Sequence, residues 1–338
     1  MPQTKTQLEE ALYATLNYFD LSEYPLTLLE THQWLWQNKA SIPEVFAGLE
    51  QHPEIENTFG MYHLKGRSKI VHTRLRRHVI TEKKLRKRQR YLRFLASLPY
   101  VEAILITNSV AIHNAHEDSD LDIAILTSSG KLWSTRFFAT LPAKLLKLRP
   151  KISQHHVEKK DKICLCFYTT PEHFNLTNER ITSPDINFIY WVATMLPIHN
   201  QNQQYETFID ANQWITDYLP NFEPIITVSS RLLKALRLPF IHSLTKLLSH
   251  EPSLRKIQQW ILPGILKKLA DAPDTRVVIN DTLIKLHAHD QRLAIQQIWQ
   301  KKIEDYQKRT IMRQSGMQKY MRLWVTKSDH APAKAHPV

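Results

Sequence analysis

Two aspartates separated by one residue are the part of the chain best suited to chemistry. Asp122 lies in the apolar run Leu121–Leu126, which predicts a short buried strand, and Asp120 directly precedes it. Because side chains alternate along a strand, both carboxylates project from the same face. Neighbouring carboxylates repel one another unless a cation lies between them, and Mg²⁺ with a nucleoside triphosphate is the usual occupant of such oxygen-only sites. The pair therefore indicates a site for Mg²⁺, or Mn²⁺, and an NTP.

The residues before this pair predict another strand and a turn. Residues 101–107 (VEAILIT) are apolar and β-branched, which indicates a buried strand, and Asn108 and Ser109 follow it at the start of a helix-like stretch. A D-x-D pair alone is common in turns and at solvated strand ends and indicates little. The order of strand, turn, helix and acidic strand is much more specific.

The stretch TNSVAIHNAHEDSDLDIAIL resembles the signature of the DNA polymerase beta-like nucleotidyltransferase superfamily, a Gly-Ser turn that opens a helix followed by Ser-Asp-x-Asp on the next strand. Ser109 precedes Asp120 by eleven residues, the spacing usual in that family. The resemblance implies that Asn108, Ser109 and Ser119 bind the nucleotide. It also implies that Asp120 and Asp122 bind the metal and are catalytic. Helix starts bind anions and nucleotidyl transfer needs metal-neutralised phosphate oxygens, so both roles are physically sound.

The resemblance extends to a bacterial group in which a winged-helix-like N-terminus precedes such a domain. Its members continue with a Gly-Arg/Lys-Leu-Trp-x-x-Arg helix and a Lys-Asp-Lys-hydrophobic-Cys-Leu strand. The matching segments are Gly130–Arg136 and Lys160–Cys166. The resemblance therefore covers most of the chain, although the group brings no established reaction with it.

Two departures from the family pattern lie in the turn and its helix. The family glycine is Asn108, and asparagine is the residue that most readily replaces glycine at positive φ. The Arg and Gly that often follow in the helix are Ile112 and His113. The phosphate and backbone contacts of those two family residues are therefore not carried over.

The third carboxylate of the family has no counterpart on the expected strand. Residues 162–168 predict that strand, and its alternate face carries Cys164 and Cys166. The nearest acids, Asp161 and Glu172, are the candidates for this role. We interpret the cysteines as small buried apolar residues, since no activating motif lies near them. Two hypotheses follow: an active Mg²⁺-dependent nucleotidyltransferase that moves a nucleoside monophosphate to an acceptor hydroxyl, and a catalytically inactive nucleotide-binding or regulatory module.

Residues 1–64 are acidic, with two Lys and nine Asp or Glu. Apolar spacing, two capping-box sequences (Thr27–Glu30 and Ser41–Glu44) and a turn at Gly60 predict three short helices and a hairpin, a winged-helix-like module. Its third helix, SIPEVFAGLEQH, carries two Glu and no Lys or Arg. Phosphate contacts supply most non-specific DNA affinity. We therefore expect a packing role or a protein partner, and a winged-helix DNA-binding regulator is the least favoured function.

Basic residues concentrate in residues 65–93, which hold thirteen Lys or Arg and one acid. They belong to a predicted basic connecting region over residues 65–97, most of which reads as one long helix. The positive charge of the chain is thus concentrated in residues 65–93, here called the belt, rather than spread evenly along the sequence. Two interpretations of the belt are open: a solvated helix, or a contact with RNA or another polyanion.

The rest of the chain divides into a nucleotidyltransferase core over residues 98–183, a mainly helical region over residues 184–326 and a disordered tail over residues 327–338. The predicted fold class is α+β, a small mixed β-sheet with flanking helices. Within the helical region, residues 275–286 predict a hairpin.

Two histidines follow that hairpin, His287 and His289. They suggest a metal or phosphate contact, but a histidine pair in a polar stretch is more often solvated, and we favour the solvated interpretation. The sequence contains no GxGxxG or P-loop motif, no signal peptide and no apolar run of membrane-spanning length. With only two cysteines, these absences lead us to expect a cytoplasmic protein without a membrane partner.

Overall fold

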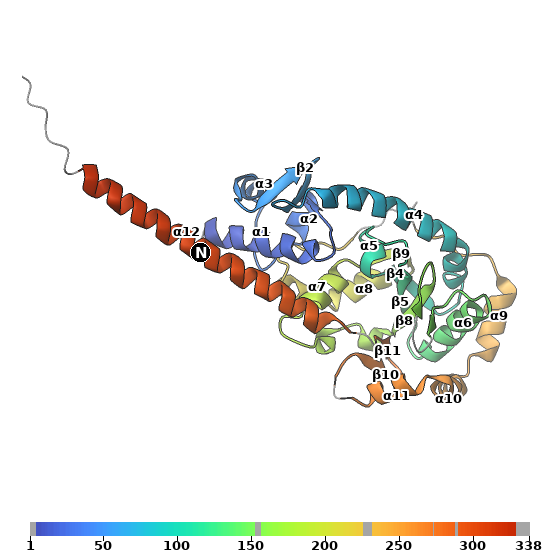
Figure 1. Ribbon diagram of the computed structural model, residues 1–338. Helices are drawn as coiled ribbons and strands as arrows, with labels where there is room; N and C mark the ends of the chain where they lie inside the picture. Colours follow the sequence, from blue (N-terminus) through green and yellow to red (C-terminus); the bar gives the residue numbers. More distant parts are fainter. Residues whose placement is uncertain (1–4, 153–156, 226–231, 273, 288–289, 329–338) are drawn as a thin grey trace, which may run out of the picture.

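A six-stranded mixed sheet lies at the centre of the molecule (Figure 1). The computed structural model describes residues 5–152, 157–225, 232–272, 274–287 and 290–328. The strand order is β10–β11–β8–β5–β4–β9, in which β5 and β8 are parallel and all other neighbours are antiparallel. The strands are β4 (Val101–Ile106), β5 (Leu121–Thr127), β8 (Ile163–Thr169), β9 (Leu196–Asn200), β10 (Val277–Ile279) and β11 (Leu283–Leu286). The predicted mixture of helices with a mixed sheet is confirmed.

Alternation along the central strands gives the sheet two apolar faces. One face, which includes Ile123, packs with helix α6 (Leu132–Leu145), and α10 (Glu251–Ile261) packs on α6. The other face, which includes Phe167, packs with α7 (Ile186–Ala193). The strands predicted from the apolar runs before and after the turn are confirmed as β4 and β5.

Strand β9 lies in the region that the sequence predicts as mainly helical. It pairs with β4 at the edge of the sheet, and the register of the pair shifts between Ile104 and Leu105. Pro197 is tolerated there because an edge strand can leave one N–H position unused. A segment of five residues with an internal proline is too short to show the alternation of apolar and polar residues that predicts a strand. Its strand conformation depends on pairing with β4.

The N-terminal residues form three helices and a three-stranded antiparallel sheet, in the order β1–β3–β2. Both predicted capping boxes are present, at Thr27–Glu30 and Ser41–Glu44. The prediction of three short helices followed by a hairpin is confirmed. The elements are α1 (Lys5–Asp20), β1 (Leu26–Thr27), α2 (Leu28–Gln33), α3 (Ile42–Gln51), β2 (Ile55–Thr58) and β3 (Met61–Leu64).

The last helix, α12 (Arg292–Ser328), runs beside α1 and extends away from the rest of the molecule (Figure 1). The indole N–H of Trp299 donates to the carbonyl of Ala14 at 2.9 Å, and Asn17 donates back to the carbonyl of Trp299 at 3.3 Å. Helices α1 and α12, far apart in the sequence, therefore share one apolar core. Of the predicted disordered tail, residues 327 and 328 belong to α12, which corrects the boundary, and residues 329–338 lie outside the described residues.

This interface buries an uncharged histidine. His52 packs with the rings of Tyr13 and Tyr306. Its Nδ1 accepts the N–H of Glu54 at 3.1 Å, and its Nε2 lies 3.2 Å from the carbonyl oxygen of Glu9, so the neutral Nε2–H tautomer satisfies both contacts. Burial lowers the pKa of His52 to about 4. Protonation of Nδ1 would remove its acceptor role, so the folded state favours the neutral ring.

We therefore expect the protein to become less stable as the pH falls, because acid protonates His52 more readily in the unfolded state than in the folded state. The unfolded state takes up the proton below its ordinary pKa of about 6.5, whereas the folded state resists until about pH 4. Between pH 7.5 and pH 5 the loss is about 2 kcal/mol relative to His52→Gln, which cannot titrate. Urea unfolding of both proteins at several pH values measures it. Parallel pH profiles for the two proteins would contradict the prediction.

The predicted basic helix is α4 (Lys69–Leu95), which runs along one side of the molecule from the three-stranded sheet past the six-stranded sheet (Figure 1). Some of its cations point inward. Arg74 donates to both carboxylate oxygens of Glu30, at 2.7 and 2.8 Å, and Arg77 pairs with Glu23 at 2.5 Å. Part of the belt is therefore neutralised by the acidic N-terminal residues.

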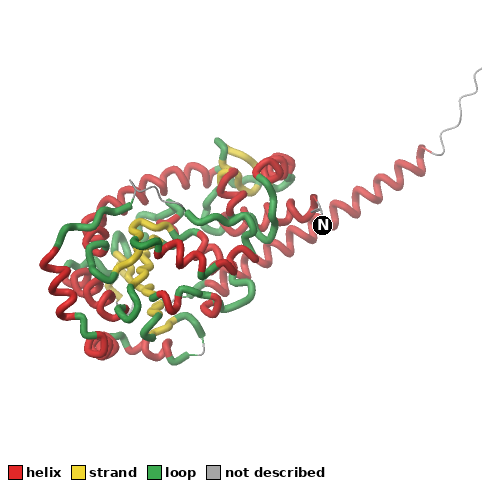
Figure 2. The backbone as a smooth tube through the Cα atoms, turned by 180° about the vertical axis from the view of Figure 1, so that it is seen from behind, coloured by secondary structure: helices red, strands yellow, loops and turns green. Residues whose placement is uncertain are grey.

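The other elements connect these layers, and Figure 2 shows them from behind. The predicted hairpin is confirmed as β10 and β11, closed by the N–H of Asn280 on the carbonyl of Leu283 at 2.9 Å. Within the described ranges, no helix is long and apolar enough to cross a membrane. The remaining α-helices and strands are α5 (Asn108–Ala111), β6 (Lys151–Ile152), β7 (Val157–Glu158), α8 (Gln204–Asp210), α9 (Pro239–Leu248) and α11 (Gly264–Ala270).

Candidate functional site

Asp120 and Asp122 lie at the start of β5, next to the start of its parallel neighbour β8. The register places Asp122 opposite Cys164, and both carboxylates are half-buried. Burial, followed by the negative charge of Asp120, raises the pKa of Asp122 to about 7. Burial also raises the pKa of Asp120. Two neighbouring buried acids whose pKa values are both raised form a place that a cation would stabilise.

Asn108 connects the turn after β4 to these acids. It has φ of +57°, the left-handed conformation that favours glycine and that asparagine most readily adopts in its place. Its side-chain N–H donates to Oδ2 of Asp122 at 2.8 Å, while the N–H of Thr107 donates to the carbonyl of Asp122 at 3.1 Å. The asparagine thus takes the conformation of a glycine and adds a contact that glycine cannot make.

Two substitutions of Asn108 separate these contributions. Asn108→Gly keeps the left-handed turn and loses only the amide contact, whereas Asn108→Ala places a residue with an unfavourable Cβ at the same φ. We expect the alanine variant to be less stable than the glycine variant by about 1 kcal/mol in urea unfolding. Equal stabilities would show that the positive φ is not a constraint.

The two serines predicted to bind nucleotide have different surroundings. Ser109 is half-buried in α5, and its carbonyl accepts the N–H of Asn114 at 2.7 Å. The hydroxyl of Ser119 accepts the N–H of His116 at 2.9 Å, which closes the turn before β5. Because α5 is a single turn, its dipole is small, and anion contacts there depend on individual N–H groups. Ser109 lies next to the turn that contacts Asp122, whereas Ser119 has a structural hydrogen bond.

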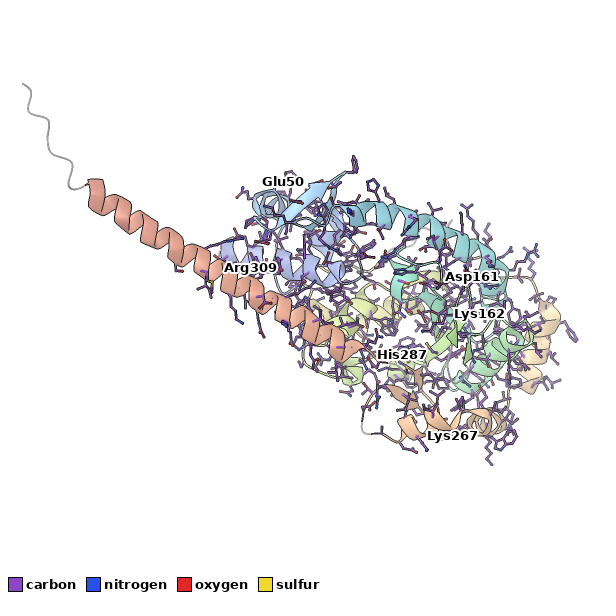
Figure 3. All side chains as sticks on the ribbon, viewed as in Figure 1. Glu50, Asp161, Lys162, Lys267, His287 and Arg309 are labelled. Carbon is purple, nitrogen blue, oxygen red and sulfur yellow. The ribbon has the colours of Figure 1, made fainter. Side chains whose placement is uncertain are left out.

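Asp161, the candidate third carboxylate, is engaged by α4 (Figure 3). Its two oxygens accept from Lys84 at 2.8 Å and from Lys87 at 2.5 Å. These contacts outweigh burial and lower the pKa of Asp161. Glu172 follows the opposite end of β8 and is hydrogen-bonded to Ser129. Neither acid is among the described groups whose ligand atoms cluster with Asp122.

The groups that do cluster with Asp122 are Cys164 and Cys166, as the alternation along β8 predicts. One ligand atom from each of the three residues lies within 4.8 Å of the others. The hydrogen bond to Cys166, and then burial, raise the pKa of the Cys164 thiol. The position expected for a third oxygen donor therefore carries two sulfurs.

His287 is half-buried beside this cluster, which corrects its interpretation as solvated. It lies just beyond β11, and its ring is hydrogen-bonded to Cys166. Burial lowers the pKa of His287, but the interaction with Cys166 outweighs burial and raises it. Because Lys285 pairs with Phe167 in the antiparallel register, two further residues bring His287 beside Leu165. The sequence predicted the hairpin that precedes His287, but it did not predict that the second strand of this hairpin pairs with β8. His289 lies outside the described residues.

Comparison with known proteins adds no relative: no protein-family model, no curated protein and no solved structure matches the chain. What the site can do therefore follows from its own residues.

Proposed function

We propose that the chain is a divalent-metal-dependent nucleotidyltransferase of the DNA polymerase beta-like superfamily, which transfers a nucleoside monophosphate from an NTP to an acceptor hydroxyl. The observation that carries the proposal is the pair of half-buried acids at the start of β5, Asp120 and Asp122, whose pKa values are both raised. The central parallel pair of a mixed sheet, with the turn at Asn108 next to Asp122, supports it.

The chain's own residues divide the work as follows. Asp120 and Asp122 offer carboxylate oxygens, which fit Mg²⁺ or Mn²⁺. Such a cation, when bound, neutralises the charge on the phosphate oxygens. Asn108 orients Asp122, and Ser109 with the N–H groups of its turn contacts the triphosphate. The acceptor oxygen bonds to the α-phosphorus as pyrophosphate leaves, and the hydroxyl proton passes to solvent.

A catalytically inactive nucleotide-binding or regulatory module is the second candidate. Cys164 and Cys166 favour it, because they occupy the strand that carries the third carboxylate in the family. Positioning and charge neutralisation supply most of the rate in phosphoryl transfer. A site with two acids can therefore remain active, although a slower one is expected.

Full-length protein with Mg²⁺ and each of the four NTPs, labelled at the α-phosphate, tests the two candidates. Nucleotide binding with pyrophosphate release, or with label transferred to RNA or protein, supports the enzyme. Binding without release in any combination supports the inactive module. Absence of binding for all four NTPs, with Mg²⁺ and with Mn²⁺, contradicts both.

The acceptor and the cellular location are further parts of the proposal. The exposed cations of residues 65–93 support RNA or another polyanion as acceptor. Arg67, Arg74 and Arg77 contribute less to such a surface, because they pair with acids of residues 1–64. A protein partner for the acidic module and a cytoplasmic location stay proposals, the latter supported by the free thiols. DNA reading by α3 (Ile42–Gln51) is disfavoured, since its sequence has no Lys or Arg.

A further inference from the structure

Four potential metal ligands from three segments meet at one end of β8. Asp122 comes from β5, Cys164 and Cys166 come from β8, and His287 follows β11. The ligand atoms of the first three lie within 4.8 Å of one another, and His287 is hydrogen-bonded to Cys166. Segments distant in sequence thus bring together one carboxylate, two sulfurs and an imidazole.

This donor set differs in chemistry from the acid pair alone. Two thiolates, an imidazole and a carboxylate are the ligands of Zn²⁺, whereas Mg²⁺ takes oxygen ligands. Tetrahedral zinc with bonds of about 2.0–2.3 Å separates its ligand atoms by roughly 3.3–3.8 Å. The ligand atoms of Asp122, Cys164 and Cys166 lie within 4.8 Å of one another, so metal binding would draw them closer together and bring in His287 from its contact with Cys166.

The surrounding structure orients these ligands. The register of β5 and β8 shifts at Ile123, so that Cys166 is the extra residue of β8, and bulges of this kind re-aim side chains beside functional sites. Asn108 holds Oδ2 of Asp122, which leaves Oδ1 for another partner. The rings of His287 and Trp191 lie nearly perpendicular, with centroids 6.0 Å apart. Partners that fix the orientation of ligands are typical of metal sites.

We propose that Asp122, Cys164, Cys166 and His287 form a tetrahedral Zn²⁺ site. Binding forms two zinc–sulfur bonds and releases the two thiol protons to the buffer, with no change in oxidation state. Four protein ligands close the coordination sphere, so the role of the ion is structural: it joins β5, β8 and the end of β11. The zinc site does not depend on nucleotide transfer, although Asp122 is the one ligand that it shares with the proposed Mg²⁺ site; Asp120 is not among the zinc ligands.

A second group of potential ligands must be separated from this one in any titration. His78 and Glu82 on α4, together with His113, also have ligand atoms within 4.8 Å of one another. His78 is exposed, and the group contains no sulfur. The double variant His78→Ala/His113→Ala removes it and leaves the thiol cluster intact.

Co²⁺ is the spectroscopic probe for the full-length, reduced protein. One equivalent should give thiolate-to-cobalt charge-transfer absorption and intense tetrahedral d–d bands, and added Zn²⁺ should displace both. The same spectrum is expected for His78→Ala/His113→Ala and for Asp120→Ala, and it should be lost in Cys164→Ser/Cys166→Ser. Absence of the charge-transfer absorption in the wild type, or its persistence in the serine variant, overturns the proposal.

Two measurements on the wild type avoid dependence on a variant that fails to fold. Zn²⁺ should raise the Tm of the reduced protein, because it binds the folded state. It should also slow the reaction of the chain's two thiols with a disulfide reagent. A Tm and a thiol reactivity that are both unchanged by Zn²⁺ count against the site. Loss of nucleotide transfer in Asp120→Ala with a retained cobalt spectrum separates the failure of one proposal from the failure of the other.

Discussion

Asp122→Asn should reduce nucleotidyl transfer by roughly 100- to 1,000-fold, and Asp120→Asn should do the same. Each change removes one negative charge from the acid pair while keeping the shape of the side chain, so the cation and the phosphates that it holds lose a charged ligand. Loss of about 3–4 kcal/mol of transition-state stabilisation corresponds to this range of rates. The measurement is the initial rate of pyrophosphate release with the preferred NTP at saturating Mg²⁺.

Asp118→Asn is the matched control for these variants. Asp118 lies two residues before Asp120 in the same loop, is exposed, and loses the same charge on substitution. A general effect of loop charge would slow all three proteins alike, whereas a metal-binding pair predicts that Asp118→Asn keeps most of its activity. A rate for Asp122→Asn within a few-fold of the wild type would exclude a catalytic role for the pair.

Strand alternation and turn preferences were sufficient to predict those parts of the site that lie within one segment of the chain. Alternation along one strand predicts that Asp120 and Asp122 share a face, and the raised pKa values agree with that arrangement. The turn preference of asparagine predicts the positive φ of Asn108. Alternation along β8 likewise predicts that Cys164 and Cys166 lie together. Each of these inferences needs only the neighbouring residues.

The parts that the sequence could not predict depend on pairing between distant segments. His287 reaches the cluster only because β11 pairs with β8, more than a hundred residues earlier in the chain. Asp161 was a candidate from its position before β8, but Lys84 and Lys87 on a separate helix engage its carboxylate. Neither partner choice can be read from local periodicity.

The sequence shows where the charged residues concentrate, but it does not show which charges pair with one another in the fold. The acidic residues 1–64 and the basic residues 65–93 suggested separate partners. The structure joins them, through pairs such as Arg67 with Asp20 at 2.8 Å and Arg74 with Glu30 at 2.7 Å. Part of the belt therefore neutralises the chain's own acids, and the cations that remain exposed define the surface to test for RNA.

Substitution of Arg292, a buried cation at the start of α12, has the largest expected effect on stability. It donates to Asp185 at 2.9 Å, to Asp290 at 2.8 Å and to the carbonyl of Glu179 at 3.0 Å. The side chain of Asp185 is only 2% exposed, and its Oδ1 accepts the N–H of Phe188 as the N-cap of α7. Removal of the guanidinium would leave this carboxylate buried without a cation.

Arg292→Met should therefore destabilise the protein by about 3–5 kcal/mol, the range for breaking one side of a buried ion pair. The control is Arg255→Met, whose partner Asp281 is exposed, and for which about 0–1 kcal/mol is expected. Asp185→Asn in the Arg292→Met background should recover part of the loss, since asparagine can still cap α7 without a buried charge. Urea unfolding at one neutral pH measures all three. Equal losses for Arg292→Met and Arg255→Met would contradict the prediction, because only Arg292 leaves a buried carboxylate without a cation.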